Sequence, residues 1–289
     1  MSWRTVVVTQ HCKLSYKNDY LVVRTEDVKM IHLSEIGTIV VDSTMVSITA
    51  YLITEILKRK IKIVFCDEKR NPIGEMVPYY AHHQSSKRIA DQVKWDEEVK
   101  KYVWTRIIQE KIINQSKLLK RLELNNSDQL LVYAADLILF DETNREGHAA
   151  KVYFNTLFGK GFTRDQETGI NAGLDYGYAI LLSSFNKELS SLGYITQLGL
   201  KHKNEFNPFN LSSDLMEPFI CFVDEIVFLE KPERMTGGLK VKLVNVLNKK
   251  VLINNQEYFL SNAISVYVRS VIKAIETGEI ENIAFPSWL

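Results

Sequence analysis

The residue pattern changes once along this 289-residue chain, and that change constrains the fold more than any other feature. The first 75 residues contain short runs rich in β-branched and aromatic residues, namely TVVVTQ, KLSY, YLVVR, VKMIHL and GTIVV. Polar triplets such as KND and TED separate the runs, and this punctuation predicts a series of strands. The segment MVSITAYLITEILKRK then places apolar residues at 48, 52, 53 and 56, which predicts one helix, and IKIVFCD predicts a buried strand.

From about residue 85 the apolar residues follow helical spacing instead. One long apolar stripe runs through Ile89, Val93, Val103, Ile107 and Ile112. Further helices are predicted from Thr143 to Gly159, from about Leu174 to Gly193, from Pro218 onward and over 258–277.

These patterns predict an α+β chain in which a small N-terminal β-rich domain with one helix precedes a larger, mainly α-helical domain. We place the domains at 1–75 and 85–289, with a linker at 76–84. The stretch DEKRNPIGEMVPYY carries two prolines and a glycine among charges, which favours a connection there.

Composition excludes several classes of protein. The longest apolar runs are far shorter than the roughly 20 residues needed to cross a bilayer, and the N-terminus lacks the pattern of a signal peptide. We therefore expect a cytoplasmic protein without a membrane partner. Cys12, Cys66 and Cys221 lie far apart, which gives no support for a zinc site and predicts free thiols. The net charge of +1 does not by itself indicate a nucleic-acid partner.

The common motifs of hydrolases, P-loop proteins and dinucleotide-binding proteins are absent, because the chain contains no GxSxG, GxxxxGK[ST] or GxGxxG. A tyrosine nucleophile remains conceivable for a recombinase. Tyr153, Tyr176 and Tyr178 fall on apolar helical stripes, however, so we expect them to be packed.

Three residues far apart in sequence could form a metal site. Glu146, His202 and Glu217 supply two hard oxygen ligands and one imidazole, a set suited to Mn²⁺ and acceptable to Mg²⁺. Each also has a simpler interpretation. Glu146 could close a capping box with Thr143, His202 could be a surface residue, and Asp214 could cap a turn with Glu217 three residues later. Spacing alone does not show that these side chains converge.

The stretch from 87 to 121 is rich in lysine and arginine. It could be a solvated helix face or a surface that contacts DNA phosphates, and local sequence leaves both interpretations open.

Three strings resemble one family in consistent order over nearly the whole chain. NREGHAAKVYFNTLFG at 144–159, INAGLDYGYAILLS at 170–183 and TQLGLKHKNEFNPFNLSSDLMEPF at 196–219 resemble the CRISPR-associated integrase of the adaptation module, the first of the Cas proteins. The N-terminal string WRTVVVTQHCKLSYKNDYLVV resembles the form of that integrase found in type II-A systems.

The resemblance implies a β-domain that mediates a homodimer and a helical catalytic domain. It also implies four integrase subunits around a dimer of a small partner, the second Cas protein, with other type II-A adaptation proteins as further partners. By motif, Glu146, His202 and Glu217 would be the catalytic residues that bind Mg²⁺ or Mn²⁺, and Asp214 would lie beside them and shape the site. The family commonly continues this motif with Arg-Pro, whereas Ile220 and Cys221 stand here, which puts a local role for that arginine in doubt.

The implied reaction is attack of a DNA 3′-hydroxyl on a phosphodiester of the CRISPR repeat, without a covalent protein intermediate. DNA contacts are then expected from basic residues near the site and along the basic stretch: Arg145, Lys201, Lys203, Lys117, Lys120 and Arg121. Two rival functions share these residues, a general metal-dependent nuclease acting on branched DNA and a DNA-binding scaffold without chemistry.

Overall fold

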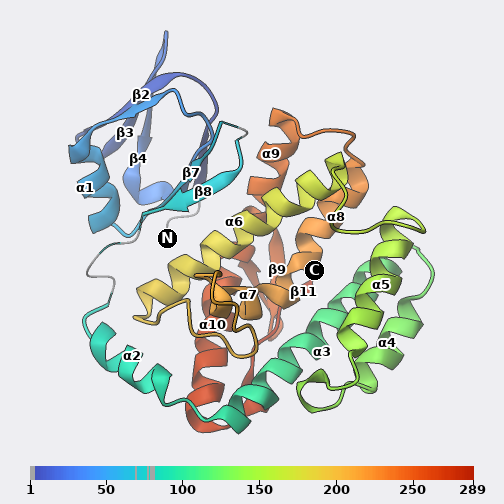
Figure 1. Cartoon of the computed structure of the whole chain (residues 1–289). Coiled ribbons are helices and arrows are strands. Elements are labelled where there is room, and N and C mark those ends of the chain that lie inside the picture. The colour runs from blue at the N-terminus through green and yellow to red at the C-terminus, as the bar shows by residue number, and fades with distance from the viewer. Residues whose placement is uncertain (1–3, 69, 77, 79–81) are drawn as a thin grey trace.

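The computed structural model describes residues 4–68, 70–76, 78 and 82–289. It confirms the α+β class, because a β-rich N-terminal domain lies beside a larger helical domain (Figure 1). Residues 77 and 79–81 of the predicted linker lie outside the described residues.

Two four-stranded sheets and one helix make up the described part of the N-terminal domain. The sheets have the strand orders β1-β5-β7-β8 and β4-β3-β2-β6. Strands β1, β5 and β7 are parallel, and β8 pairs antiparallel with β7 at the edge. The elements are β1 (Arg4–Val8), β2 (Cys12–Lys17), β3 (Tyr20–Arg24), β4 (Val28–His32), η1 (Leu33–Glu35), β5 (Ile36–Val41), β6 (Val46–Ile48), α1 (Ala50–Lys58), β7 (Lys62–Cys66) and β8 (Pro72–Glu75).

The two sheets and α1 share one hydrophobic core. Its centre is formed by side chains without solvent exposure from both sheets and from the buried face of α1, including Leu14, Leu21, Ile39, Leu52 and Ile56. The helix begins later than predicted, because Val46–Ile48 pairs with β2 as a strand and the Thr49 side chain then caps α1 by accepting a bond from the Leu52 amide.

The stretch DEKRNPIGEMVPYY is only partly a connection, which corrects the sequence-based interpretation. Pro72–Glu75 forms β8, an edge strand. Proline is tolerated at the first residue of an edge strand because no ladder hydrogen bond is needed from its nitrogen there. Proline and glycine in this stretch therefore did not exclude a strand.

The helical domain contains nine α-helices among the described residues, together with a small three-stranded sheet of order β10-β9-β11. The elements are α2 (Ser85–Val93), α3 (Glu97–Arg121), α4 (Ser127–Ala135), η2 (Leu139–Asp141), α5 (Arg145–Phe158), α6 (Gly169–Ser191), α7 (Asn210–Met216), η3 (Glu217–Phe219), α8 (Ile220–Glu230), α9 (Gly237–Val244), η4 (Asn245–Asn248), β9 (Lys250–Ile253), β10 (Gln256–Phe259), α10 (Leu260–Thr277), η5 (Ile280–Asn282) and β11 (Ser287–Trp288).

The apolar stripe predicted over 89–112 belongs to two helices. The Asp96 side chain accepts bonds from the backbone amides of Glu98 and Val99 at 2.8 and 3.0 Å and so starts α3. Ile107 in α3 is fully buried, whereas Val93 at the end of α2 is 67% exposed. Periodicity alone did not reveal the break because the apolar spacing continues across it.

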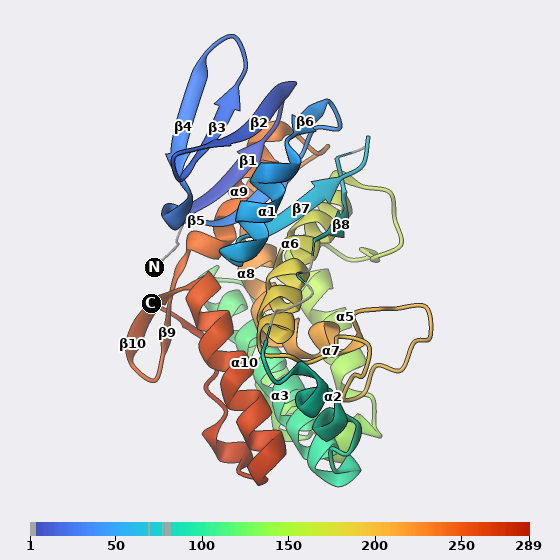
Figure 2. The same cartoon turned by 90° about the vertical axis from the view of Figure 1, so that its left-hand side faces the viewer.

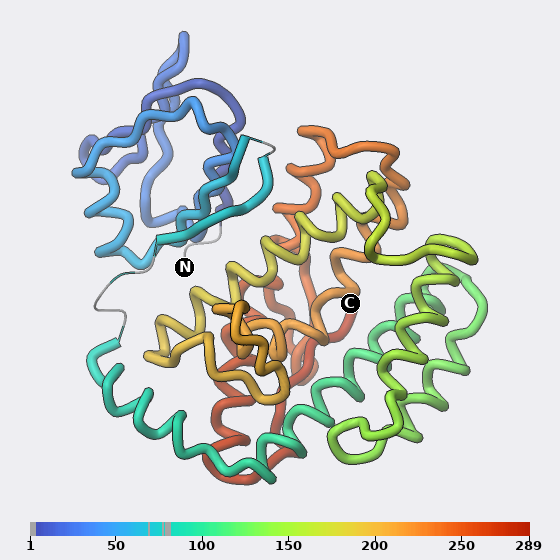
Figure 3. Tube along the Cα trace, viewed as in Figure 1, coloured from blue at the N-terminus to red at the C-terminus, as the bar shows by residue number. Residues whose placement is uncertain are grey.

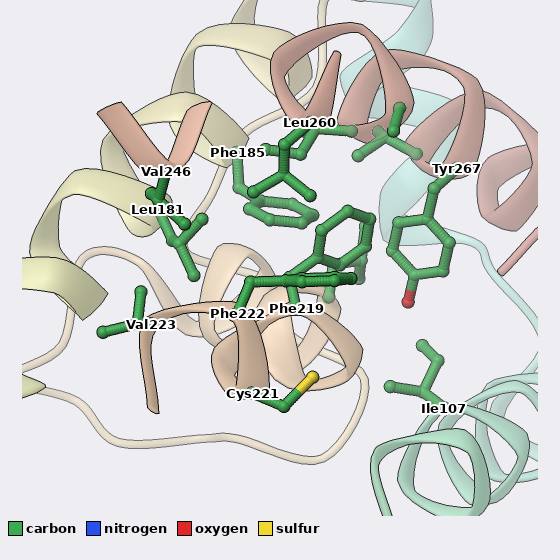
Figure 4. Packing of buried hydrophobic residues seen from close by; sticks show 14 of the residues in the cluster. Ile107, Leu181, Phe185, Phe219, Cys221, Phe222, Val223, Val246, Leu260 and Tyr267 are labelled. Carbon is green, nitrogen blue, oxygen red and sulfur yellow. The ribbon is translucent and has the colours of Figure 1, made fainter. Parts of the chain in front are cut away.

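Helices α6, α8 and α10 and the turn η3 contribute rings to one aromatic core. In Figure 4, Phe219 and Phe222 lie close to Phe185 of α6 and Tyr267 of α10. The rings of Phe185 and Phe219 meet edge to face with centroids 5.2 Å apart. The predicted helix start at Pro218 is wrong, because α7, η3 and α8 follow one another without a break from Asn210.

The N-terminal domain lies against α6 and α9 (Figures 2 and 3). Lys240 of α9 pairs with the fully buried Asp42 at 3.3 Å, and Lys187 of α6 donates to the Gly37 carbonyl at 3.0 Å. These buried contacts fix the two domains against each other. No described helix is both long enough and apolar enough to span a membrane.

Candidate functional site

Glu146 lies in the first turn of α5, a helix that packs against α3. The alternative interpretation of Glu146 as part of a capping box with Thr143 is wrong, since Asn144 occupies the N-cap position without a side-chain cap bond. Asp141 replaces it: its carboxylate accepts bonds from the amides of Arg145 and Glu146 at 2.6 and 3.0 Å. Because the cap is made elsewhere, the Glu146 carboxylate is free to face α3. The predicted end of this helix at Gly159 is confirmed.

His202 is held by the carboxylate of Asp214, which is fully buried in α7. The Asp214 carboxylate lies 2.6 Å from His202 Nδ1 and also accepts bonds from the backbone amides of Leu200 and Lys201 at 2.6 and 3.1 Å. Asp214 therefore binds the loop that carries His202, so the alternative interpretation, in which Asp214 caps a turn with Glu217, is wrong.

Gly199 allows this loop to approach Asp214, a requirement that the sequence interpretation missed. A Cβ atom at Gly199 would lie 2.5 Å from the His202 carbonyl oxygen and 2.8 Å from Asp214 Oδ2. Both distances are shorter than any real Cβ contact, so only glycine fits without moving the loop.

Glu217 lies where α7 ends and η3 begins, and α3 holds this junction. The fully buried side chain of Asn114 donates to the Pro218 carbonyl at 3.1 Å. On the other side, Phe219 packs into the aromatic core of Figure 4. The backbone around Glu217 is thus fixed from two directions, and its carboxylate points toward α3.

Lys111 of α3 connects the two carboxylates. Its Nζ lies 2.7 Å from Glu146 Oε1 and 2.7 Å from Glu217 Oε2. The Lys111 side chain is 10% exposed, and such a buried ammonium is stable only when paired. The sequence interpretation counted Lys111 only as part of a basic stretch. Lys111 lies on the apolar face of the helix, four residues after Ile107 and next to Ile112, and this position in the sequence could have indicated a buried lysine.

The charges of these groups perturb one another. Burial lowers the pKa of Lys111, but the attraction of Glu217 and Glu146 outweighs it and raises that pKa. Burial raises the pKa of Glu217, aided by repulsion from Glu146 and opposed by Lys111. The pKa of Glu146 is lowered, because Lys111 outweighs the effect of burial. The hydrogen bond to Asp214 raises the pKa of His202. The pKa values of the two carboxyl groups are therefore shifted in opposite directions, that of Glu146 downward and that of Glu217 upward.

The two carboxylates and the imidazole are ligands that suit a hard divalent ion. In this structure, however, the Lys111 ammonium lies between the two carboxylates. Across the described part of the chain, no three His, Cys, Asp or Glu side chains stand close enough together to hold a metal as they are. In this arrangement Lys111 lies between Glu146 and Glu217. Two carboxylate oxygens nevertheless converge on a single cation, which is the chemistry such an ion requires.

A cleft of about 780 Å³ opens beside His202. Residues of α2, α3, the turn between these helices and the segment 197–210 line it, among them Trp95, Lys100 and Lys203. Phe206 at its rim is 93% exposed. The cleft gives His202 access to solvent.

The basic residues predicted to contact DNA have varied surroundings. The Lys201 ammonium lies 3.7 Å from the ring centroid of Trp104 and donates to the Phe140 carbonyl, so it supports the loop before α5. Lys120 is exposed. The others have acidic neighbours: Lys117 with Glu110 at 3.2 Å, Arg121 with Glu225 at 3.2 Å, Arg145 with Asp136 at 3.9 Å and Lys203 with Glu97 at 4.0 Å. Their contact with DNA stays a prediction.

The three tyrosines considered as nucleophiles, Tyr153, Tyr176 and Tyr178, pack as predicted. Tyr153 and Tyr176 are almost fully buried, and Tyr153 and Tyr178 donate hydrogen bonds to the buried carboxylate of Asp224 at 2.7 and 2.5 Å. Burial raises the pKa of both hydroxyls, the opposite of what a nucleophile requires. Burial likewise raises the pKa of Asp224 to about 6, against the effect of the two tyrosine bonds.

Two carboxylates and an oriented imidazole on a helical domain, beside a β-rich domain, define a candidate acid–histidine site in an α+β fold. The model of the family described as CRISPR associated protein Cas1 matches residues 5–234. Because the match covers most of the chain, the protein belongs to the Cas1 family.

A curated relative agrees with this assignment, and solved structures share the fold. The CRISPR-associated endonuclease Cas1 of Neisseria meningitidis serogroup C (strain 8013) is 30% identical over 298 aligned positions, covering 100% of this chain and 97% of the relative. A casposase bound to integration product is similar in fold, with a TM-score of 0.72, 20% identity and coverage of 96% and 91%. A chain of a Cas6-RT-Cas1–Cas2 complex gives a TM-score of 0.74 at 19% identity. The match covers 97% of this chain and 36% of that one.

Proposed function

We propose that this protein is a divalent-metal-dependent DNA integrase and endonuclease of CRISPR adaptation. The observation that carries the proposal is the meeting of Glu146 and Glu217 at one cation, beside His202, in a chain of the Cas1 family. The similarity in fold to a casposase bound to integration product supports strand joining in particular.

Glu146, His202 and Glu217 would hold the ion, either Mg²⁺ or Mn²⁺. Asp214 binds Nδ1 of His202, so the imidazole presents Nε2 as its free nitrogen. The carboxylate oxygens of Asp214 are occupied by backbone amides and by the imidazole, which supports an orienting role. When bound, the ion supplies positive charge that stabilises the charge developing on a phosphodiester under attack.

The proposed reaction is a transesterification. The 3′-hydroxyl of the captured fragment attacks a phosphorus atom of the repeat, a new P–O bond forms, and the bond to the leaving 3′-oxygen breaks. The number of phosphodiester bonds is unchanged, so no other reactant is consumed. The buried tyrosine hydroxyls bound to Asp224 favour direct attack over a protein–DNA intermediate.

Partners follow from the same comparisons. A chain of similar fold belongs to a Cas6-RT-Cas1–Cas2 complex, which supports a small Cas2 partner. We also propose a complex of four subunits with a Cas2 dimer. A homodimer through the N-terminal domain is supported by the edge strand β4, whose Val28 and Met30 are 57% and 47% exposed. The N-terminal string that resembles type II-A integrases supports that subtype.

The test is to combine the purified protein with its small partner, a plasmid carrying a repeat, and end-labelled DNA in the presence of Mg²⁺ or Mn²⁺. Label joined at the repeat boundary supports an integrase, whereas cut and unjoined DNA supports a general nuclease. Full strand transfer by both Glu146→Ala and His202→Ala would return the protein to the scaffold hypothesis.

A further inference from the structure

The position between Glu146 and Glu217 is occupied by a cation that belongs to the chain itself. Lys111 Nζ lies 2.7 Å from one oxygen of each carboxylate. Lys111 extends from the buried face of α3, between Ile108 and Ile112, which are 1% and 0% exposed. It is therefore an internal residue of the helix packing, in contrast to the exposed lysines further along α3.

The three groups depend on one another. A lysine in apolar surroundings is costly unless a counter-charge is present, and Lys111 has two. The side chains of Glu146 and Glu217 are only 27% and 15% exposed, and without a cation between them their charges would repel each other in a poorly solvated space. The ammonium thus stabilises the same pair of carboxylates that are proposed to bind the ion.

Both cations need the same two oxygen atoms. Oxygen ligands approach Mg²⁺ to about 2.0–2.1 Å, so an ion bound to Glu146 Oε1 and Glu217 Oε2 would take the place of the ammonium. Positive charges this close also repel strongly in a partly buried site. The lysine stem is flexible and can withdraw without disturbing the helix.

Resting on the proposed function, we propose that Lys111 and the divalent ion compete for the position between Glu146 and Glu217, so that the ion binds only as Lys111 withdraws. The lysine acts as a built-in counter-ion that keeps the carboxylate pair in place and weakens metal binding. It is a residue that regulates loading of the site rather than a ligand.

The first arm of the test measures Mn²⁺ binding by titration calorimetry without DNA. Lys111→Met, which keeps an unbranched side chain one atom shorter than lysine and removes the charge, should bind Mn²⁺ at least tenfold more tightly than the unaltered protein. Lys117→Met is the matched control, because Lys117 lies on the same helix with a half-exposed side chain, and its affinity should be unchanged. Glu146→Gln should bind weakly. Equal or weaker Mn²⁺ binding by Lys111→Met would overturn the proposal.

The second arm needs no substitution at Lys111 and remains informative if Lys111→Met does not fold. Reductive methylation of the unaltered protein, read by peptide mass spectrometry, reports which amines are accessible. Lys111 should be protected without metal and become labelled with saturating Mg²⁺, while Lys117 should be labelled equally in both. Protection of Lys111 that persists at saturating Mg²⁺ would show that the two cations coexist, against the proposal.

The two proposals fail separately. Competition for metal without strand transfer by the unaltered protein would reject the integrase function and leave the inference standing. Metal-dependent strand transfer without competition between Lys111 and the ion would support the integrase function and reject the inference about Lys111. If calorimetry detects no divalent ion in either the unaltered protein or Lys111→Met, the inference falls.

Discussion

Replacing Asp214 by asparagine tests how the loop that carries His202 is held. The Asp214 carboxylate is fully buried, binds the imidazole at 2.6 Å and accepts from the amides of Leu200 and Lys201 at 2.6 and 3.1 Å. Asparagine has almost the same shape, but only one of its two terminal atoms can accept a hydrogen bond. At least one backbone amide, or the imidazole, loses its partner.

The magnitude follows from these contacts. A hydrogen bond to a charged group contributes about 1.5–3 kcal/mol. Since the His202 side chain is 45% exposed, we count only the loss of such a bond and expect Asp214→Asn to lower the free energy of unfolding by about 1.5–3 kcal/mol. That is a substantial fraction of the roughly 5–15 kcal/mol typical of a folded domain.

Two measurements check this expectation in chelator, so that metal binding does not enter. Urea denaturation gives the change in free energy, and amide hydrogen exchange gives its location. Exchange at Leu200 and Lys201 should accelerate at least tenfold in Asp214→Asn. Asp224→Asn is the matched control, because Asp224 is equally buried but touches only tyrosine hydroxyls, and it should leave these two amides protected. Unchanged exchange together with a loss below about 1 kcal/mol would refute the reasoning.

Three further perturbations probe other parts of the account. Asp224 has a pKa raised to about 6 from 3.8, so its contribution to stability is full below about pH 4 and is lost as the pH rises through 6. Asp224→Asn should therefore be relatively more stable at pH 8 than at pH 4, by about 3 kcal/mol in urea denaturation, and an identical pH profile would contradict this. Gly199→Ala should slow strand transfer at least tenfold, since its Cβ would meet the His202 carbonyl oxygen at 2.5 Å; activity within twofold would show that the loop adapts. Neutralising Lys117, Lys120 and Arg121 together should flatten the salt dependence of DNA binding, by up to about 3 in the slope of log affinity against log salt. An unchanged slope would show that these residues do not contact DNA phosphates.

The sequence predicted the class of fold because its two periodicities are strong and separate. It predicted less well where short elements depend on their neighbours. Strands β6 and β8 were missed, since Val46–Ile48 merges into a helical pattern and Pro72 suggests a turn. The hairpin of β9 and β10 carried a usable signal. Asn254 and Asn255 have φ values of 50° and 62°, and adjacent asparagines suit such a two-residue turn.

The candidate site likewise has features that the sequence could predict and features that it could not. Residue type made Glu146, His202 and Glu217 a possible ligand set, but only the resemblance to a family assigned them to one site. Residues 146 and 217 are 71 positions apart, and no local pattern shows that they meet. Their meeting at Lys111, the cap supplied by Asp141 and the space left by Gly199 are properties of packing. Lys111 in particular looked like any charged residue of a basic helix until its partners were placed.

One measurement addresses the central claim directly: strand transfer of labelled DNA into a repeat-containing plasmid, in the presence of the small partner, in chelator and after Mg²⁺ is added back. The account predicts no joined product in chelator, joined product at the repeat boundary on adding Mg²⁺, and a loss of at least 100-fold in Glu217→Gln, equivalent to about 2.7 kcal/mol. Joining of equal rate in chelator, or by Glu217→Gln with Mg²⁺, would contradict a metal-dependent integrase built on these residues.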